Sequence, residues 1–482
     1  MLAPWVVDEM NTADLNDKRL DSRLREVLSQ LGARPVASIP AACGGHAETT
    51  AAYRFFDNEK VTFGNVLQPH QAATRQRLAG QAVAVLAQDT TELDLTRPGE
   101  QVAGAGPLDG SARYGVLLHL LTAFTPDGTP LGTLEAQTWV RDEEAVRTAS
   151  LSRAQRAATP FVQKESYRWV QTLQQAQTIA RDLPQTRLIC VADSEADIYE
   201  LLVAGQTEPR SVEWIVRACQ NRAVVSGEET AAYVREQALA QPVLFTQTIK
   251  VRGRQPKVGC ETRGRRQPRE SRTAEVEVRA ASVRLRPPQR PDQKLPEIGV
   301  QVVLVREIAP RPGDEPVEWL LLTSLPAGDA EQARQVIQYY CTRWMIEIFF
   351  RTLKQGCRVE ERRFEHIDRV LPCLAVFLIV AWRTLYVCRL SRSVPDISCE
   401  AVFEPSEWKA VYRVVRREAP PSKPPPLAEV VRLVAQLGGY VNRPRKDPPG
   451  PQTVWIGLQR MHDFALCWDL FGPEAKSQLQ LV

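Results

Sequence analysis

The chain has 482 residues, room for roughly two to four domains, and its 44% hydrophobic and 24% charged residues are typical of a soluble globular protein. Its net charge of +4 does not by itself indicate a nucleic-acid partner. The ten cysteines form no Cys-x-x-Cys pair, which argues against a zinc site and favours reduced thiols in a cytoplasmic protein. The start carries no signal-like apolar run and the most apolar stretch, residues 370–382, is too short to cross a bilayer, so no membrane contact is expected.

Residues 1 to about 70 are expected to be helical. Residues 14–31 carry apolar side chains at helical spacing with basic residues among them, which predicts an amphipathic helix, and residues 47–56 predict a second one. A small basic helical domain suits DNA binding, although helical domains of this size serve many other purposes. We therefore interpret residues 1–70 as an N-terminal helical DNA-binding domain.

Two apolar runs predict buried strands, and each is followed by an aspartate. Residues 82–87 precede Asp89, and residues 187–192 precede Asp193. A single aspartate after a strand is more often a turn or helix-cap residue, but two in this order point to ligand groups at the end of a sheet. Two further acids on the same segments, Asp94 and Asp197, lie further from their strands and are ranked lower.

The chain between and after these aspartates alternates strands and helices. A turn at 125–129 joins two strand-like runs into a hairpin, and residues 164–182 have helical character. From about 213 to 325 the pattern is β-rich, with strands expected at 213–218, 243–251, 274–285, 298–307 and 317–323. Residues 250–290 carry thirteen Lys or Arg against four Glu, which fits either a solvated loop or a phosphate-contacting surface.

Residues 329–354 predict a helical stretch, which can include a bend, with one acid between several cations. At 100° per residue one face holds Tyr340, Arg343, Glu347, Arg351 and Lys354. Another face, expected in the core, holds Ile346, Phe349, Phe350 and Leu353. The row fits a surface helix with i,i+4 ion pairs, but it also suits a DNA enzyme whose acid binds metal while the cations hold phosphates.

Three acids separated in sequence are sufficient for phosphodiester chemistry. The reaction needs charge neutralised on the attacking and leaving oxygens, which two Mg²⁺ ions roughly 4 Å apart can provide. Mg²⁺ prefers carboxylate oxygens and keeps several waters, so few protein ligands are required. Asp89, Asp193 and Glu347 are therefore the candidate catalytic metal ligands, with Mg²⁺ expected and Mn²⁺ as its substitute.

These residues resemble the bacterial insertion-sequence transposases with a DDE triad, of the cut-and-paste, hairpin-forming type. Tyr340, Arg343, Glu347 and Lys354 match the Tyr-x2-Arg-x3-Glu-x6-Lys signature of that family. Residues 88–91 and 190–198 resemble its two aspartate segments. Weaker resemblances lie at residues 52–55, 318–324 and 437–440.

The resemblance implies an α/β fold with an RNase H-like catalytic domain at 71–390. A β-rich insertion at about 213–325 would explain the 154-residue gap from Asp193 to Glu347. A C-terminal helical dimerisation domain is expected at 391–482. The implied partners are a second copy of the chain, the terminal inverted repeats of the transposon and the target DNA. The implied location is the bacterial nucleoid. Cleavage by water, hairpin formation and strand transfer are the implied reactions.

The resemblance also assigns individual DNA contacts. Trp319 matches the aromatic residue that stacks a flipped base, and Arg217 resembles a basic DNA-contacting position. Ser194 is a departure, because the family often has a basic residue directly after the second aspartate.

Two alternatives stay open. One is another RNase H-fold nuclease or recombinase, against which the signature helix argues. The other is a domesticated or inactive transposase that binds DNA without cutting it. Inverted repeats flanking the coding region would favour a mobile element.

Overall fold

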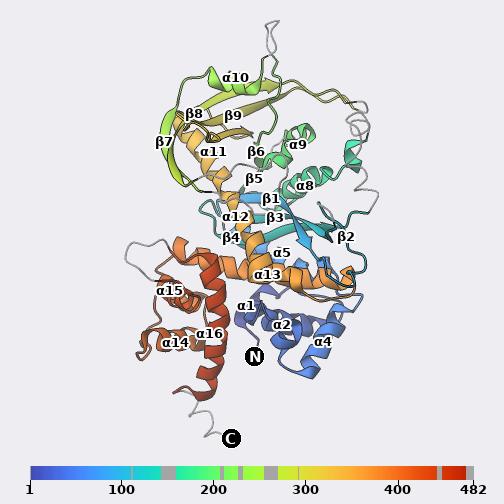
Figure 1. Cartoon of the computed structure of the whole chain (residues 1–482), viewed down its shortest axis with the longest axis vertical. Helices are drawn as coiled ribbons and strands as arrows, with labels where there is room; N and C mark the ends of the chain where they lie inside the picture. The colour runs from blue at the N-terminus through green and yellow to red at the C-terminus, as the bar shows by residue number, and fades with distance from the viewer. Residues whose placement is uncertain are drawn as a thin grey trace. The chain divides into compact units, whose positions relative to one another are not determined.

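A computed structural model describes the chain as two compact units. Unit 1 comprises residues 1–81, 90–150 and 344–482, and unit 2 comprises residues 82–89 and 151–343. The structure describes residues 2–109, 112–142, 159–206, 211–225, 232–253, 270–290, 293–441 and 448–473. Figure 1 labels the elements of both units along the chain.

Unit 2 is built on a mixed sheet. Its parallel strands are β5 (Arg187–Ala192), β6 (Glu213–Arg217) and the part of β1 (Val83–Asp94) up to Asp89. The sheet continues antiparallel through β10 (Glu318–Thr323), β9 (Ile298–Glu307), β8 (Arg272–Leu285) and β7 (Phe245–Val251). The helices of this unit are α8 (Tyr167–Asp182), α9 (Tyr199–Ala204), α10 (Val234–Leu239) and α11 (Ala330–Thr342), with 3₁₀ turns at Phe161–Gln163 and Ser194–Ala196.

The strands of unit 2 follow the predicted patterns. All five predicted strands of the β-rich region occur within two residues of their expected bounds. In β5 every residue after Arg187 is buried, as expected for a parallel strand covered on both faces. In β8 buried and exposed residues largely alternate, because successive side chains of a strand point to opposite faces. The α/β fold class is confirmed.

Unit 1 combines an antiparallel β-structure with most of the helices. Its strands are β2 (Gly106–Pro107), β3 (Tyr114–Phe124) and β4 (Pro130–Trp139), and β3 and β4 form the predicted hairpin. The N-terminal helices are α1 (Pro4–Glu9), α2 (Lys18–Ala33), α3 (Ile39–Cys43), α4 (His46–Phe56) and α5 (Phe63–Ala79). The later elements are α12 (Trp344–Arg351), a π turn (Thr352–Gly356), 3₁₀ turns at Val359–Glu361 and Cys399–Ala401, α13 (Ile367–Ser393), α14 (Pro405–Arg416), α15 (Leu427–Leu437) and α16 (Pro451–Phe471).

The central helix of unit 1 is longer than the apolar stretch that predicts it. α13 continues past Trp382, where Arg383 donates to the carbonyl of Val402 and Arg392 to that of Pro449. Among the described residues it alone is long and apolar enough to cross a membrane, yet 83% of its most apolar window is buried inside the fold. Burial by neighbouring helices accounts for this composition, as in the core helix of a soluble protein.

The C-terminal region is helical, as predicted. Figure 1 shows α14, α15 and α16 side by side, and they pack with the end of α13 around a shared core. Trp408, Val431 and Val454 are among its buried members. None of the nine cysteines in the described part of the chain forms a disulfide, and Cys260 lies outside that part.

Unit 1 also encloses a charged cluster that the sequence analysis did not predict. Glu9 accepts hydrogen bonds from Nδ1 of His70 at 2.5 Å and from both terminal nitrogens of Arg77 at 2.9 and 3.0 Å. Nε2 of His70 accepts the N–H of Thr133 at 3.0 Å, so the imidazole is neutral. The guanidinium of Arg77 stacks 4.2 Å from the ring of Trp382. The cluster thereby ties α1, α5, β4 and α13 together.

Candidate active site

The two candidate aspartates lie at equivalent positions along neighbouring parallel strands, Asp89 within β1 and Asp193 directly after the last residue of β5. The register of β1 and β5 pairs Ala87 with Val191, and each aspartate follows two residues later, as Asp89 and Asp193. Carboxyl ends of parallel strands meet at one edge of a sheet, which is where ligand groups collect in α/β folds. Contrary to the prediction, β1 does not end before Asp89: it continues to Asp94, with more exposed side chains from Asp89 onward.

Asp193 has a structural contact as well as a favourable position. One of its carboxylate oxygens accepts the N–H of Glu195 at 2.8 Å, which caps the 3₁₀ turn that follows. The side chain is only partly buried. The capping function considered for such an aspartate is therefore present, and it uses one hydrogen bond of a group that can accept several.

Arg343 of the signature contacts the first aspartate. Its guanidinium lies 3.2 Å from the carboxylate of Asp89, and the two side chains are 8% and 13% exposed. The same guanidinium lies 5.9 Å from the ring centre of Tyr340. Burial raises the pKa of Tyr340, while the positive charges of Arg343 and Arg217 oppose that rise. Unit 2 thus gathers five predicted site residues: Asp89, Asp193, Arg217, Tyr340 and Arg343.

Trp319 belongs to the same group. Its ring meets that of Tyr340 edge to face, with centroids 5.6 Å apart. Trp319 is only partly buried, whereas Leu321 and Leu322 beside it are completely buried. The neighbouring Glu318 is held by two hydrogen bonds from Arg235, at 2.7 and 2.9 Å. Trp319 therefore sits on a fixed strand with part of its surface open.

The signature residues lie on two consecutive helices and a π turn, where the sequence predicts a helical stretch that can include a bend. α11 ends at Thr342, α12 begins at Trp344, and a π turn follows at Thr352–Gly356. The N–H of Arg343 donates to Tyr340, and the N–H of Cys357 reaches five residues back to Thr352. Both irregularities rotate later residues away from an ideal 100° spacing. The shared face of the five signature residues stays a prediction, while Ile346, Phe349, Phe350 and Leu353 are buried as expected.

The remaining signature residues belong to unit 1. Glu347 lies on α12 and is partly exposed, and Arg351 is exposed. Nζ of Lys354 donates to the carbonyl oxygen of Glu92 and lies 3.6 Å from the carboxylate of Glu360. Because Lys354 and Glu360 are each partly exposed, this ion pair contributes little to stability and is easily exchanged.

The two lower-ranked acids have structural partners. Asp94 forms an ion pair with Arg113 at 2.8 Å. Asp197 is fully buried, accepts two backbone N–H groups and binds Arg222 at 2.6 Å. Both carboxylates therefore serve to fix loops.

The described cations of the basic region are partly engaged within the fold and partly open to solvent. Residues 254–269 lie outside the described residues. Arg272 is buried against Glu307 and Asp314, and Arg290 pairs with Glu200. Lys250, Arg252, Arg284 and Arg286 are exposed, so the choice between a solvated loop and a phosphate-contacting surface stays open.

A joint site for a metal ion stays a prediction. Asp89 and Asp193 belong to unit 2 and Glu347 to unit 1. Within the described ranges, no three His, Cys, Asp or Glu side chains are grouped closely enough to hold a metal ion. The donor chemistry nevertheless suits a hard divalent cation, because all three candidates are carboxylates and the pair in unit 2 is partly open to solvent.

Three family models match the chain in consecutive segments. They describe a transposase DNA-binding domain at residues 3–61, a transposase DDE domain at 164–372 and a Tn5 transposase dimerisation domain at 379–467. Asp193, Glu347 and Lys354 fall within the DDE match, and Asp89 precedes it.

The solved structures similar to part of the chain include the piggyBac transposase synaptic complex with hairpin DNA, at 11% identity and a TM-score of 0.30. The match covers 68% of this chain and 52% of that one, so the chain spans about half the length of that protein. With DNA-binding, DDE and dimerisation segments in this order, the chain belongs to the Tn5 family of DDE transposases.

Proposed function

We propose that this protein is an active DNA transposase. It cuts DNA at the terminal inverted repeats of its element, joins the cut strands into hairpins, reopens them and transfers the ends into target DNA. The observation that carries this proposal is the pair Asp89 and Asp193, which lie at equivalent positions along the neighbouring parallel strands β1 and β5. The guanidinium of the signature residue Arg343 lies 3.2 Å from the carboxylate of Asp89.

A divalent metal, Mg²⁺ with Mn²⁺ as substitute, would be held by Asp89, Asp193 and Glu347. When bound, it supplies the positive charge that stabilises the attacking and leaving oxygens of the phosphodiester. Before DNA arrives, Arg343 offsets the negative charge of Asp89 at the sheet edge. Asp193 keeps its backbone cap through one oxygen, which fixes the orientation of the carboxylate.

The cations of the signature are proposed to hold the DNA backbone. Phosphate contacts set the register of the DNA on the protein and carry no sequence information themselves. Arg351 is exposed, and Lys354 is held by a partly exposed ion pair with Glu360 that a phosphate can replace. Arg217, on the strand next to that of Trp319, adds a further positive charge near Tyr340.

Trp319 is proposed to receive the base that leaves the stack when a hairpin forms. An open aromatic face offsets part of the stacking that the flipped base loses. The edge contact with Tyr340 and the ion pair at Glu318 hold the indole in place. Its partial exposure supports this interpretation over a core residue.

A homodimer is proposed as the form that pairs two ends. Leu466, Leu470 and Phe471 of α16 are 43%, 62% and 83% exposed. Apolar side chains this open on one helix mark a surface that a partner covers. The position of Leu466 within the matched dimerisation segment supports a second copy of the chain as that partner.

The deciding experiment combines purified protein, Mg²⁺ and linear DNA that carries the inverted repeats of the element. We expect a nicked product first and a hairpin next, and loss of both with Asp193→Asn. The asparagine retains the cap to Glu195, so the variant should fold normally. DNA binding without any cleavage by the natural chain would identify an inactive copy. Cleavage that never yields a hairpin would favour another RNase H-fold nuclease.

A further inference from the structure

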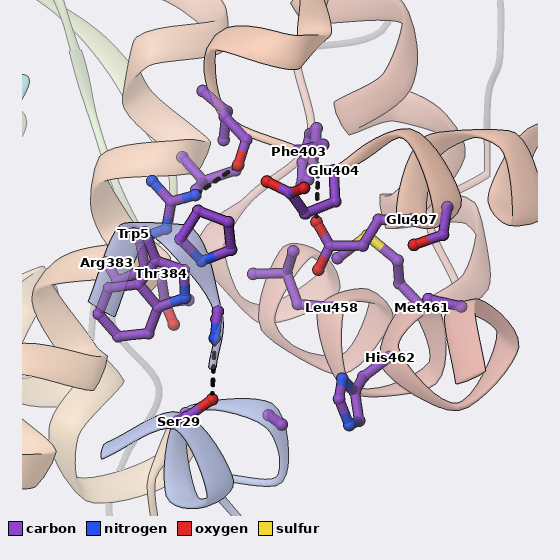
Figure 2. A pocket seen from close by; sticks show the side chains of 18 of the residues that line it. Trp5, Ser29, Arg383, Thr384, Phe403, Glu404, Glu407, Leu458, Met461 and His462 are labelled. Carbon is purple, nitrogen blue, oxygen red and sulfur yellow. Dashed lines mark hydrogen bonds between the residues drawn. The ribbon is translucent and has the colours of Figure 1, made fainter. Parts of the chain in front are cut away.

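A pocket of about 480 Å³ lies in unit 1, lined by residues that the proposed reaction does not use. Its walls come from α1, α2, the second half of α13, the start of α14 and α16 (Figure 2). A volume of this size is in the usual range for small-molecule sites. The feature that sets it apart is the chemistry of its lining.

Two opposite charges share the pocket without forming an ion pair. The Arg383 guanidinium donates to the carbonyl of Val402 at 2.6 Å, and its centre lies 5.6 Å from the ring of Trp5. Glu407 accepts the N–H of Glu404 at 2.9 Å, within a capping box at the start of α14. In the part of the chain that the structure describes, no carboxylate oxygen lies within 4.0 Å of Arg383.

Both charges are partly withdrawn from water. Burial lowers the pKa of Arg383 and raises that of Glu407, and in each case the opposite charge of the other opposes the effect. Figure 2 shows Arg383 and Trp5 on one side of the pocket and Glu404 and Glu407 on the other. A buried charge without a direct partner is costly, so each group favours a ligand of opposite charge.

The rest of the lining is mainly apolar, and one of its polar groups lacks a hydrogen-bond partner in the described residues. Phe403, Leu458 and Met461 supply apolar surface. The indole Nε1 of Trp468 is buried and has no hydrogen-bond partner in the described residues, so an acceptor is needed there. Burial lowers the pKa of His462, which keeps that imidazole neutral near pH 7 and adds no positive charge.

We propose that this pocket binds a small zwitterion with an apolar body, of the α-amino acid class, with its carboxylate on Arg383 and its ammonium group on Glu407. A simple anion would leave Glu407 unmatched and would meet the further negative charges of Glu404 and Asp469. A simple amine would leave Arg383 unmatched. Only a ligand with both charges satisfies both groups, while the apolar walls bury its side chain.

Ligand binding has a structural consequence that can be measured. The walls come from the matched DNA-binding segment and from the matched dimerisation segment, which occur together in unit 1. A ligand that binds only the folded protein raises its melting temperature. The site can therefore be detected without DNA and without catalysis.

The first test compares three matched probes on the full chain: L-phenylalanine, phenethylamine without the carboxylate and 3-phenylpropanoate without the amine. The other common amino acids extend the panel. We expect at least one amino acid to bind in calorimetry and to raise the melting temperature, and the two single-charge analogues to bind at least tenfold more weakly. Equal binding of an analogue, or no binding by any amino acid at millimolar concentration, would overturn the proposal.

The second test uses variants that keep the shape of the pocket. Glu407→Gln retains an oxygen for the cap to Glu404 and Trp468→Phe retains an aromatic ring, so both should fold. We expect Glu407→Gln to weaken binding of the amino acid at least tenfold and Trp468→Phe to weaken it a few-fold. Glu429→Gln, which changes an exposed ion pair with Arg416, is the matched control and should bind normally. Natural affinity in a folded Glu407→Gln variant would refute the site.

Discussion

Glu9 in unit 1 and Asp193 in unit 2 are both carboxylates within α/β structure, but their surroundings differ. Glu9 is 4% exposed, and its oxygens accept three hydrogen bonds from His70 and Arg77. Burial acts to raise the pKa of Glu9, but His70 and Arg77 outweigh it and lower the pKa. Asp193 is partly open and accepts one backbone hydrogen bond, from Glu195.

The comparison shows that a carboxylate that stabilises the fold and a carboxylate that is available for metal binding have different surroundings. A buried carboxylate that accepts three hydrogen bonds within the fold stabilises the protein but leaves little capacity for a metal ion or a substrate. A carboxylate held by one backbone contact keeps a fixed orientation and retains capacity for a ligand. Substitution of the two acids should therefore produce opposite phenotypes.

The clearest contrast should come from Glu9→Gln, compared with Asp193→Asn. Loss of the Glu9 charge leaves Arg77 without its buried partner, which costs about 3 kcal/mol in free energy of unfolding. Asp193→Asn keeps the cap and should change that free energy by less than about 0.5 kcal/mol. Urea denaturation of both variants measures the difference. If Asp193→Asn is the more destabilised, Asp193 is a structural residue and the comparison fails.

Two tryptophans allow the same comparison between a residue that stabilises the fold and a residue proposed to act on DNA. Trp382 is 4% exposed and contacts both Arg77 and His70, so Trp382→Ala should cost about 3–5 kcal/mol of stability. Trp319→Ala should leave stability nearly unchanged and slow hairpin formation by about ten- to a hundredfold, equivalent to the 1–3 kcal/mol of base stacking. Gel assays that separate nicked from hairpin DNA measure this step. Hairpin formation at the natural rate in Trp319→Ala would exclude base stacking at this residue.

The smallest effect should be a pH dependence that originates in the buried cluster. Burial lowers the pKa of His70 below its ordinary 6.5. The unfolded chain then binds a proton at a pH where the folded protein does not, so stability is full above about pH 6.5 and falls as the pH drops toward the folded pKa. His70→Gln should flatten the slope of unfolding free energy against pH below about pH 6.5. An unchanged slope would mean that His70 is not neutral in the fold.

The sequence predicted the elements of the sheet better than the contacts between them. Apolar runs bounded by polar residues located β5, β8 and β9, because burial on one or both faces determines composition. The level placement of Asp89 and Asp193 depends on strand register, which no local signal fixes.

Other features lay beyond sequence reasoning for identifiable reasons. Glu9 and His70 are 61 residues apart, and each is an ordinary polar residue of a helix until the fold buries them together. The break at Arg343 carries no Gly or Pro nearby, so the helical pattern continued through it. Arg383 and Glu407 likewise meet only through packing of α13 against the C-terminal helices.

The central claim is that Asp89, Asp193 and Glu347 jointly hold a divalent metal ion. Its most direct test is to measure Mn²⁺ binding to the complex of the protein with pre-cut DNA ends by electron paramagnetic resonance. The natural chain should bind Mn²⁺ in a form distinct from hexaaqua ion. Asp89→Asn, Asp193→Asn and Glu347→Gln should each reduce that affinity at least tenfold, while Asp94→Asn, at the acid that pairs with Arg113, should not. Undiminished Mn²⁺ binding by a folded, DNA-bound Glu347→Gln variant would contradict the account.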